Sequence, residues 1–249
     1  MLLELTAVAA AGVAAGAANS IAGGGALITF PTMVALGLPP LTANVTNTVG
    51  IVPASVGGAL GYSDLLREQG ARFTRLLVPL LLGAVAGSAA LLLTSNEAFE
   101  AIVPALIAGS CLLLLFQPRL VPHIAHAGNE RSPYLLAGIA FCGAYQAYFG
   151  SAVSILVFAL LALFVADTLQ HLNALKIVLA GSSNLLAALI FAVLAPVHWR
   201  YALTIMVSSF LGGRAGAHYA RRIPAEPLRI SIAVIGLVVA AVLAVRAFG

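Results

Sequence analysis

Charged residues are scarce in this sequence. Asp, Glu, Lys and Arg together make up 8% of its 249 residues, whereas hydrophobic residues make up 61%. So few charges cannot solvate the surface of a soluble protein of this length, and apolar runs of about 20 residues recur along the chain. The composition therefore excludes a soluble globular domain and predicts a protein with many membrane-spanning helices.

The groups needed for several kinds of chemistry are also missing. Cys111 and Cys142 both lie in apolar runs and form no CxxC pair, which indicates small core residues. His123 and His126 have no cysteine or carboxylate at metal-ligand spacing, and the sequence offers no Ser-His-Asp setting or P-loop lysine. We therefore expect no enzymatic activity, no bound metal and no cofactor.

The apolar part of the chain divides into ten segments. Eight approach or reach the roughly 20 residues that a helical span needs, whereas two cover only about 20 Å of a hydrocarbon core about 30 Å thick. This pattern predicts an all-α polytopic membrane protein with eight long helices and two short, broken or re-entrant ones. The segments are 3–22, 26–38 (short), 43–62, 72–93, 98–117, 133–149, 152–166 (short), 172–195, 199–219 and 228–247.

The two halves of the chain correspond residue by residue under nearly one offset. The two short segments occupy matching places, and we predict two transmembrane repeats, residues 1–120 and 133–249, joined by the linker 121–132 within one integral membrane domain. Two GxxxG pairs, which also correspond, predict close helix packing. The matched pairs are Gly16 with Gly143, Asn19 with Gln146, Gly23 with Gly150, Asn44 with Asn173, Asn47 with Lys176, Ser55 with Asn184, Tyr62 with Phe191, Gly83 with Gly212, Gly87 with Gly216 and Glu97 with Glu226.

The arginines predict how the segments cross the membrane. With five segments per repeat, most of the arginines that flank the segments fall on one side and only Arg200 and Arg246 on the other, whereas four crossings per repeat would scatter them. The arginine-rich side is cytoplasmic by the positive-inside rule. Because five is odd, the second repeat is expected to be inverted, with both termini on the non-cytoplasmic side. The clustered arginines are Arg67, Arg72, Arg75, Arg119, Arg131, Arg221, Arg222 and Arg229.

Two further details concern the ends of the segments. No Lys or Arg precedes the first apolar run, unlike the basic start of a signal peptide, so we expect a retained first helix. The pair Arg221-Arg222 flanks a helix end, which favours contact with anionic lipid over nucleic acid.

A break interrupts the first long apolar run at Asn19, Ser20, Ile21, Ala22, Gly23, Gly24 and Gly25. Each glycine costs a helix roughly 1 kcal/mol relative to alanine, and glycine-interrupted short segments in both halves of a repeat are typical of transporter sites near the bilayer midplane. The helix after such a break points free N–H groups at the cavity, which suits an anion. The matching break carries Gln146, Tyr148, Gly150 and Ser151. The alternative is that the glycines serve only helix packing.

The placement of charge indicates the sign of the substrate. All eight acidic residues lie at segment ends or in loops, whereas Lys176, the only lysine, lies within an apolar run. A buried cation needs a partner, and an anionic substrate could supply it. The alternative is that Lys176 extends to the cytoplasmic headgroups. Arg214 is similarly embedded, and we favour a position near the cytoplasmic end of its helix.

Neutral polar residues accompany this charge. Asn44, Asn47 and Thr48 share a helix face by their spacing and could orient an oxyanion, or could instead form hydrogen bonds between helices. Asn173 is the repeat partner of Asn44. Ser182, Ser183 and Asn184 are weaker examples of the same pattern.

Residues 12–62 resemble the opening repeat of the sulfite exporter TauE/SafE family. The resemblance rests on the run 19–25, then Phe30-Pro31, then residues 37–40 and 43–47, and the doubled layout extends it over almost the whole chain. It implies an inner-membrane transporter of sulfur oxyanions or organosulfonates, such as sulfite or sulfoacetate. The second half departs from the family pattern, since residues 145–151 replace a repeated glycine run.

The hypothesis is a secondary transporter, an exporter of small sulfur-containing anions, that works by alternating access in the lipid bilayer. The alternatives are a membrane scaffold without transport and an anion channel. The sequence leaves a homodimer open, and His171 could exchange a proton. The expected substrate-binding residues are Asn19, Ser20, Gly23, Gly24, Gly25, Asn44, Asn47, Thr48, Gln146, Tyr148, Ser151, Asn173 and Lys176.

Overall fold

The computed structural model describes residues 2–21, 24–54, 69–120, 129–219 and 225–248. Within these ranges it contains ten α-helices and no strand, which confirms the predicted all-α class. The helices are α1 (Leu2–Ile21), α2 (Ala26–Ala35), α3 (Pro40–Gly50), α6 (Gly70–Leu93), α7 (Asn96–Leu120), α8 (Pro133–Tyr148), α9 (Val153–Phe164), α10 (Leu169–Leu194), α11 (Trp199–Tyr219) and α12 (Ala225–Phe248).

The lengths of the helices follow the hydropathy of the sequence. The two segments predicted to be short are helices of 10 and 12 residues, α2 and α9. Helix α3 begins at Pro40, earlier than predicted, because proline is well suited to the first position of a helix. The later part of that predicted span, residues 55–62, lies outside the described residues.

Five of the described helices are long and apolar enough to cross a membrane. Helix α11 is also 21 residues long, but its sequence is more polar. Helix α8 has 16 residues and is followed by a break. The qualifying spans are Leu2–Ser20, Gly70–Leu93, Asn96–Phe116, Gln170–Leu194 and Glu226–Val245.

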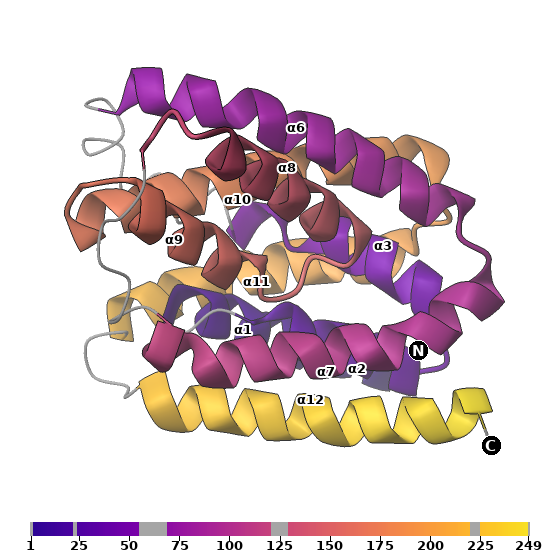
Figure 1. The fold of residues 1–249 in the computed structure, drawn as a ribbon. Helices are drawn as coiled ribbons and strands as arrows, with labels where there is room; N and C mark the ends of the chain where they lie inside the picture. The colour runs from indigo at the N-terminus through magenta and orange to yellow at the C-terminus, as the bar shows by residue number, and fades with distance from the viewer. Residues whose placement is uncertain (1, 22–23, 55–68, 121–128, 220–224, 249) are drawn as a thin grey trace.

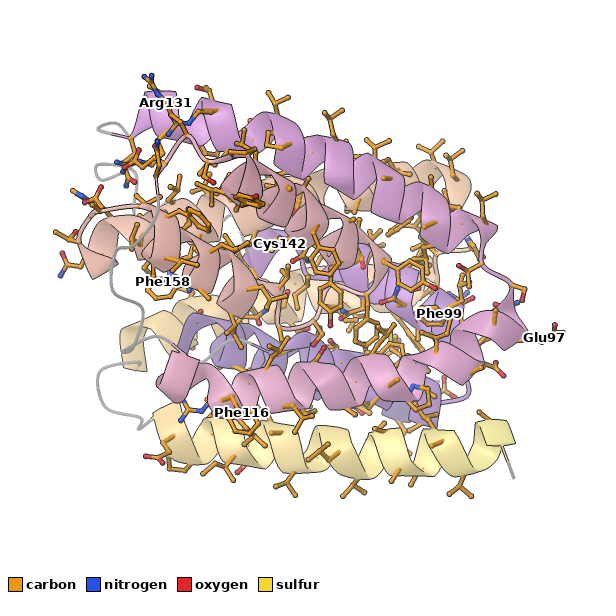
Figure 2. All side chains as sticks on the ribbon, in the orientation of Figure 1. Glu97, Phe99, Phe116, Arg131, Cys142 and Phe158 are labelled. Carbon is orange, nitrogen blue, oxygen red and sulfur yellow. The ribbon has the colours of Figure 1, made fainter. Side chains whose placement is uncertain are left out.

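The helix axes run roughly along one direction in a bundle (Figure 1). Helix α6 forms one side of the bundle in this view, α12 forms the opposite side next to α7, and the two chain termini lie at the same end. Glu97 lies at that end and Arg131 lies at the other (Figure 2). The inverted orientation of the second repeat in a membrane stays a prediction.

Helices α6 and α8 approach each other at glycines. A Cβ atom added to Gly83 would overlap the carbonyl oxygen of Ala140, and one added to Gly87 would overlap that of Ala144. Only glycine permits such contact between two backbones, and in a membrane this close packing is a main source of helix association. The predicted role of this GxxxG pair in helix packing is thus confirmed.

Helices α1 and α11 pack in the same way. Cβ atoms added to Gly212 and Gly216 would collide with Val13 and Ala17 respectively. Val13 corresponds to Ala140 and Gly212 to Gly83 under the offsets of the predicted alignment (140 − 13 = 127; 212 − 83 = 129). The two glycine-lined interfaces therefore follow the same alignment, and each joins one helix from each half of the chain.

Two clusters of buried apolar side chains fill the bundle. The larger contains residues of all ten described helices, and the smaller lies among α6, α8, α9 and α10. Cys111 is buried in the first cluster and Cys142 in the second, so neither is paired. This confirms that both cysteines are core residues.

We expect Gly83→Leu to destabilise the fold, because its side chain would force α6 away from Ala140. Overpacking of a tight contact costs about 1–3 kcal/mol. The matched control is Gly109→Ala on α7, where an added Cβ meets nothing within 4 Å; this change should leave stability unchanged or raise it by up to about 1 kcal/mol. Thermal unfolding of both variants in one detergent checks the difference, and equal melting temperatures would contradict it.

Candidate functional site

The first break in a helix lies between α1 and α2. Gly24 has a positive φ of 80°, a conformation that glycine adopts without strain. The N–H of Gly25 donates a hydrogen bond of 2.8 Å to Oδ1 of Asn19, and the substrate-binding role of Asn19 stays a prediction. Gly23, the other predicted glycine of this site, lies outside the described residues.

The second break lies between α8 and α9. Gly150 has φ of 75°, and Ala152 has φ of 59°, the only positive φ of a non-glycine residue in the described part of the chain. An alanine in this left-handed region costs roughly 1–2 kcal/mol, which the surrounding contacts must offset. Between them, Ser151 is 1% exposed, and its Oγ has no hydrogen-bond partner among the described atoms.

Helix α7 lies beside both breaks. Leu114 packs against Gly24 of the first break. Ser110, one helical turn earlier, donates a hydrogen bond of 3.5 Å to the carbonyl oxygen of Ser151 in the second break. The hydroxyls of Ser110 and Tyr145 are 2.9 Å apart. The two breaks therefore lie along neighbouring turns of one helix.

Helix α2 also contacts the second break. The rings of Phe30 and Phe149 meet edge to face with centroids 5.8 Å apart. One residue earlier, the buried hydroxyl of Thr29 donates a short hydrogen bond to Oδ1 of Asn47 on α3. Helix α2, in the first half of the chain, thus packs directly on the break between α8 and α9.

Buried amides join the two halves of the chain. Nδ2 of Asn44 donates a hydrogen bond of 2.8 Å to the carbonyl oxygen of Tyr148. On α10, Nδ2 of Asn184 donates a hydrogen bond of 3.3 Å to the carbonyl oxygen of Thr48. Its Oδ1 accepts a hydrogen bond of 3.4 Å from Nε2 of Gln146. Of these five residues, all except Tyr148 are buried. The hydrogen bonds between helices that we set against a substrate role are therefore present, and each amide retains further donors or acceptors.

Ser20 and the hydroxyl of Tyr148 make contacts outside this network. The hydroxyl of Tyr148 lies 3.2 Å from that of Thr94, so only its backbone carbonyl meets Asn44. Ser20 donates 2.9 Å to the carbonyl oxygen of Gly213 on α11. Asn173 is half-buried on α10, and Arg214 is exposed.

Lys176 has an aromatic neighbour. Its ammonium lies 5.6 Å from the ring centroid of Phe158 on α9, a cation–π contact. No hydrogen bond or ion pair joins it to another described residue. Figure 2 shows Phe158 in the same half of the bundle as Arg131. The role of Lys176 as a counter-charge for the substrate stays a prediction.

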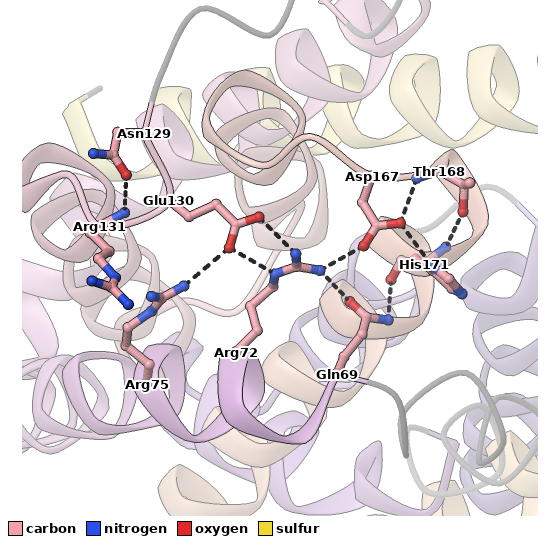
Figure 3. Close-up of polar contacts among 9 residues, drawn as sticks. All are labelled: Gln69, Arg72, Arg75, Asn129, Glu130, Arg131, Asp167, Thr168 and His171. Atoms are coloured by element: carbon pink, nitrogen blue, oxygen red, sulfur yellow. Dashed lines mark hydrogen bonds and ion pairs between the residues drawn. The ribbon is translucent and has the colours of Figure 1, made fainter.

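A second polar cluster lies at the end of the bundle opposite the chain termini (Figures 2 and 3). Nη2 of Arg72 is 2.7 Å from Glu130, and its Nη1 is 2.6 Å from Asp167. Arg75 is 3.3 Å from Glu130, and Nδ1 of His171 is 2.7 Å from Asp167. These charges line a pocket of about 460 Å³ and connect the start of α6 with the segments that precede α8 and α10.

Asp167 lies between α9 and α10, outside the membrane-spanning helices. Burial acts to raise the pKa of its carboxyl, but hydrogen bonds from Arg72, His171 and the N–H of Thr168 outweigh burial and lower that pKa. The carboxylate is therefore the stable form near neutral pH, and the cluster keeps its ion pairs there.

Several residues of both sites carry too little signal in the sequence to be found. Thr29, Ser110 and Tyr145 are single polar residues in apolar runs, and their partners lie on other helices. In the sequence, Arg72 and Asp167 mark only the ends of apolar segments. The hydropathy pattern does not show that the side chains of these two residues line the same pocket.

The comparison with known proteins covers nearly the whole chain. Residues 8–243 match the model of a family described as "Sulfite exporter TauE/SafE". A "Probable membrane transporter protein" of Haemophilus influenzae is 29% identical over 210 residues, 80% of this chain and 78% of that protein. The "Probable membrane transporter protein ORF9" of a Sinorhizobium species is 27% identical over 238 residues, 91% and 87% of the two chains. YfcA of Escherichia coli K12, with the same description, is 24% identical over 231 residues, 91% and 84%.

Acid should weaken the fold through Asp167. Because its pKa is lowered in the folded state, the stabilisation is fully present above the pKa of an unfolded aspartate, about 3.9, and is lost as pH falls through the folded value. We expect Asp167→Asn to cost about 1–3 kcal/mol at neutral pH and to flatten the acid side of the stability curve. Melting temperatures from pH 7 to pH 3 check this. Glu97→Gln, an exposed residue at the other end, should keep the wild-type slope.

Proposed function

Because the chain belongs to the sulfite exporter TauE/SafE family and is a multi-pass membrane transporter, we propose that it exports small sulfur-containing anions. The substrate class is sulfite, sulfoacetate or another organosulfonate. The transport is secondary and proceeds by alternating access at a site near the bilayer midplane. The membrane is the inner (cytoplasmic) membrane, with both termini on the non-cytoplasmic side.

The observation that carries this proposal is the pair of helix breaks. Both contain backbone in the left-handed region, both lie beside α7, and buried amides from the two halves of the chain surround the second. Irregular backbone at membrane depth is tolerated where it is buried in protein or lines a cavity. The unpartnered hydroxyl of Ser151 precedes α9 directly and is available to a ligand at the start of that helix.

The charges favour an anion at this site. The sequence contains no charged residue between Glu4 and Asp64 or between Arg131 and Asp167, so both breaks lie in neutral stretches. Hydroxyls, amides and the N–H groups at the start of a helix stabilise negative charge, and no carboxylate within those stretches opposes it. A metal cation would find only weak neutral ligands there.

The packing supports alternating access by relative movement of helix pairs. The two tightest interfaces, α1 with α11 and α6 with α8, each hold one broken-helix arm against a helix of the other half. Between the halves, the hydrogen bond from Asn184 to the carbonyl oxygen of Thr48 is long, at 3.3 Å. We expect each of these two helix pairs to move as a unit, while the amide hydrogen bonds between the halves break and form again.

Transport by purified protein in liposomes tests the proposal. Sulfite, sulfoacetate, sulfate, thiosulfate and acetate are offered in parallel, and we expect saturable uptake of the sulfite or sulfonate anions with counterflow. Flux without counterflow would indicate an anion channel instead. If no anion is bound or moved while a metal cation is, the proposal is wrong.

Lys176→Met tests the counter-charge role and separates a carrier from a scaffold. A charge-assisted contact is worth roughly 1.5–3 kcal/mol, so a carrier should fold but lose about ten- to a hundredfold in anion affinity. Lys176→Arg, which keeps the charge, is the control. A scaffold should show no change in binding and should gain stability from the loss of a buried charge.

A further inference from the structure

The carboxylate of Glu130 is held by two arginines. Arg72 binds it side-on, with Nε 3.2 Å from Oε2 and Nη2 2.7 Å from Oε1. Nη2 of Arg75 lies 3.3 Å from Oε2 (Figure 3). This two-point geometry is the one by which arginine binds carboxylate and other oxyanions. The pocket around it, about 460 Å³, has room for a small anion.

The remaining atoms of Arg72 are fixed by neighbours. Its Nη1 donates 2.6 Å to Asp167 and 3.3 Å to Oε1 of Gln69. Gln69 also donates 3.1 Å to the carbonyl oxygen of His171 at the start of α10. The edge of the guanidinium that meets Glu130 is therefore oriented whether or not Glu130 occupies it.

Glu130 does not satisfy all the donors that face it. Nε of Arg75 is buried and has no hydrogen-bond partner in the described part of the chain. This atom lies on the same edge of the guanidinium as the Nη2 that contacts Glu130, the edge that arginine uses for side-on binding. A carboxylate has two oxygens, already shared between the arginines, whereas a sulfite or sulfonate group has three.

We infer that Arg72 and Arg75 form an access site for a three-oxygen sulfur anion, and that Glu130 occupies this site until the substrate displaces it. The choice of anion rests on the proposed function. Exchange of one anion for another keeps the charge balance of the pocket, with Asp167 still paired to Arg72. Displacement frees the segment before α8 from the start of α6, so that arrival of substrate loosens this end of the bundle.

Glu130→Gln tests the inference. The apparent affinity of a site is reduced by the fraction of time an internal competitor fills it, so removing a competitor present nine tenths of the time tightens binding about tenfold. Methanesulfonate, sulfite and acetate are titrated into purified protein at constant ionic strength, and dissociation constants are measured by calorimetry. We expect about tenfold tighter binding of methanesulfonate and sulfite by the variant, with a smaller gain for acetate.

Controls separate this site from a general effect of charge. Glu226→Gln removes an exposed carboxylate and should leave affinity unchanged. Adding Arg75→Gln to Glu130→Gln should abolish the gain, whereas adding Ser151→Ala should not. An unchanged affinity in folded Glu130→Gln, a gain that survives Arg75→Gln, or a gain lost with Ser151→Ala would each overturn the inference. Because loss of Glu130 could unfold the protein, Arg75→Gln alone is a second variant, and it should weaken binding in the otherwise native chain.

The outcome is independent of the transport test. If liposomes show no flux of any anion but Glu130→Gln tightens binding as described, the access site stands and the proposed transport fails. If flux is observed and Glu130→Gln changes neither affinity nor rate, transport stands and the access site fails.

Discussion

The close approach of backbones at glycines is the contact on which the rest of the structure depends. Lipid provides no hydrophobic force between helices, so association relies on packing and on polar contacts. Gly83 and Gly87 let α6 lie against α8, and Gly212 and Gly216 let α11 lie against α1. Because α1 and α8 are the helices that end in the breaks, these interfaces hold both breaks in place.

The breaks in turn impose a polar interior. Each interrupted helix exposes backbone groups that lipid cannot satisfy, and the protein meets this need with neutral side chains from other helices. Asn184 serves both halves at once, because it bonds to Thr48 and Gln146. The ion pairs of Arg72 with Glu130 and Asp167 lie instead at one end of the bundle, where water lowers the cost of burying charge. In the proposed transporter, the neutral interior selects the anion by hydrogen bonding, and the charged end attracts it.

Hydropathy predicted the helices well because membrane spans are long and uniformly apolar. The break at Gly24 was predictable because glycine interrupts such a run visibly, and the GxxxG pairs were predictable because their spacing matches one helix face. Asn44 was identified but not its partner, the carbonyl of Tyr148, which lies 104 residues away. Contacts of this kind depend on how each helix is rotated about its axis relative to its neighbours, and a single sequence does not predict that rotation. For the same reason the aromatic contact of Lys176 and the shared pocket of Arg72 and Asp167 were not predicted.

The crossed pairing of helices bears on how the protein is made. The partner of α1 is α11, which begins at Trp199, so roughly 10 to 40 s of synthesis separate the two at common elongation rates. During that time the glycine face of α1 has only lipid or the insertion machinery to cover it. The second half meets no such delay, since α6 is already in the membrane when α8 emerges. The glycine-lined face of α1 therefore gains its helix partner only when α11, in about the last fifth of the sequence, has been inserted.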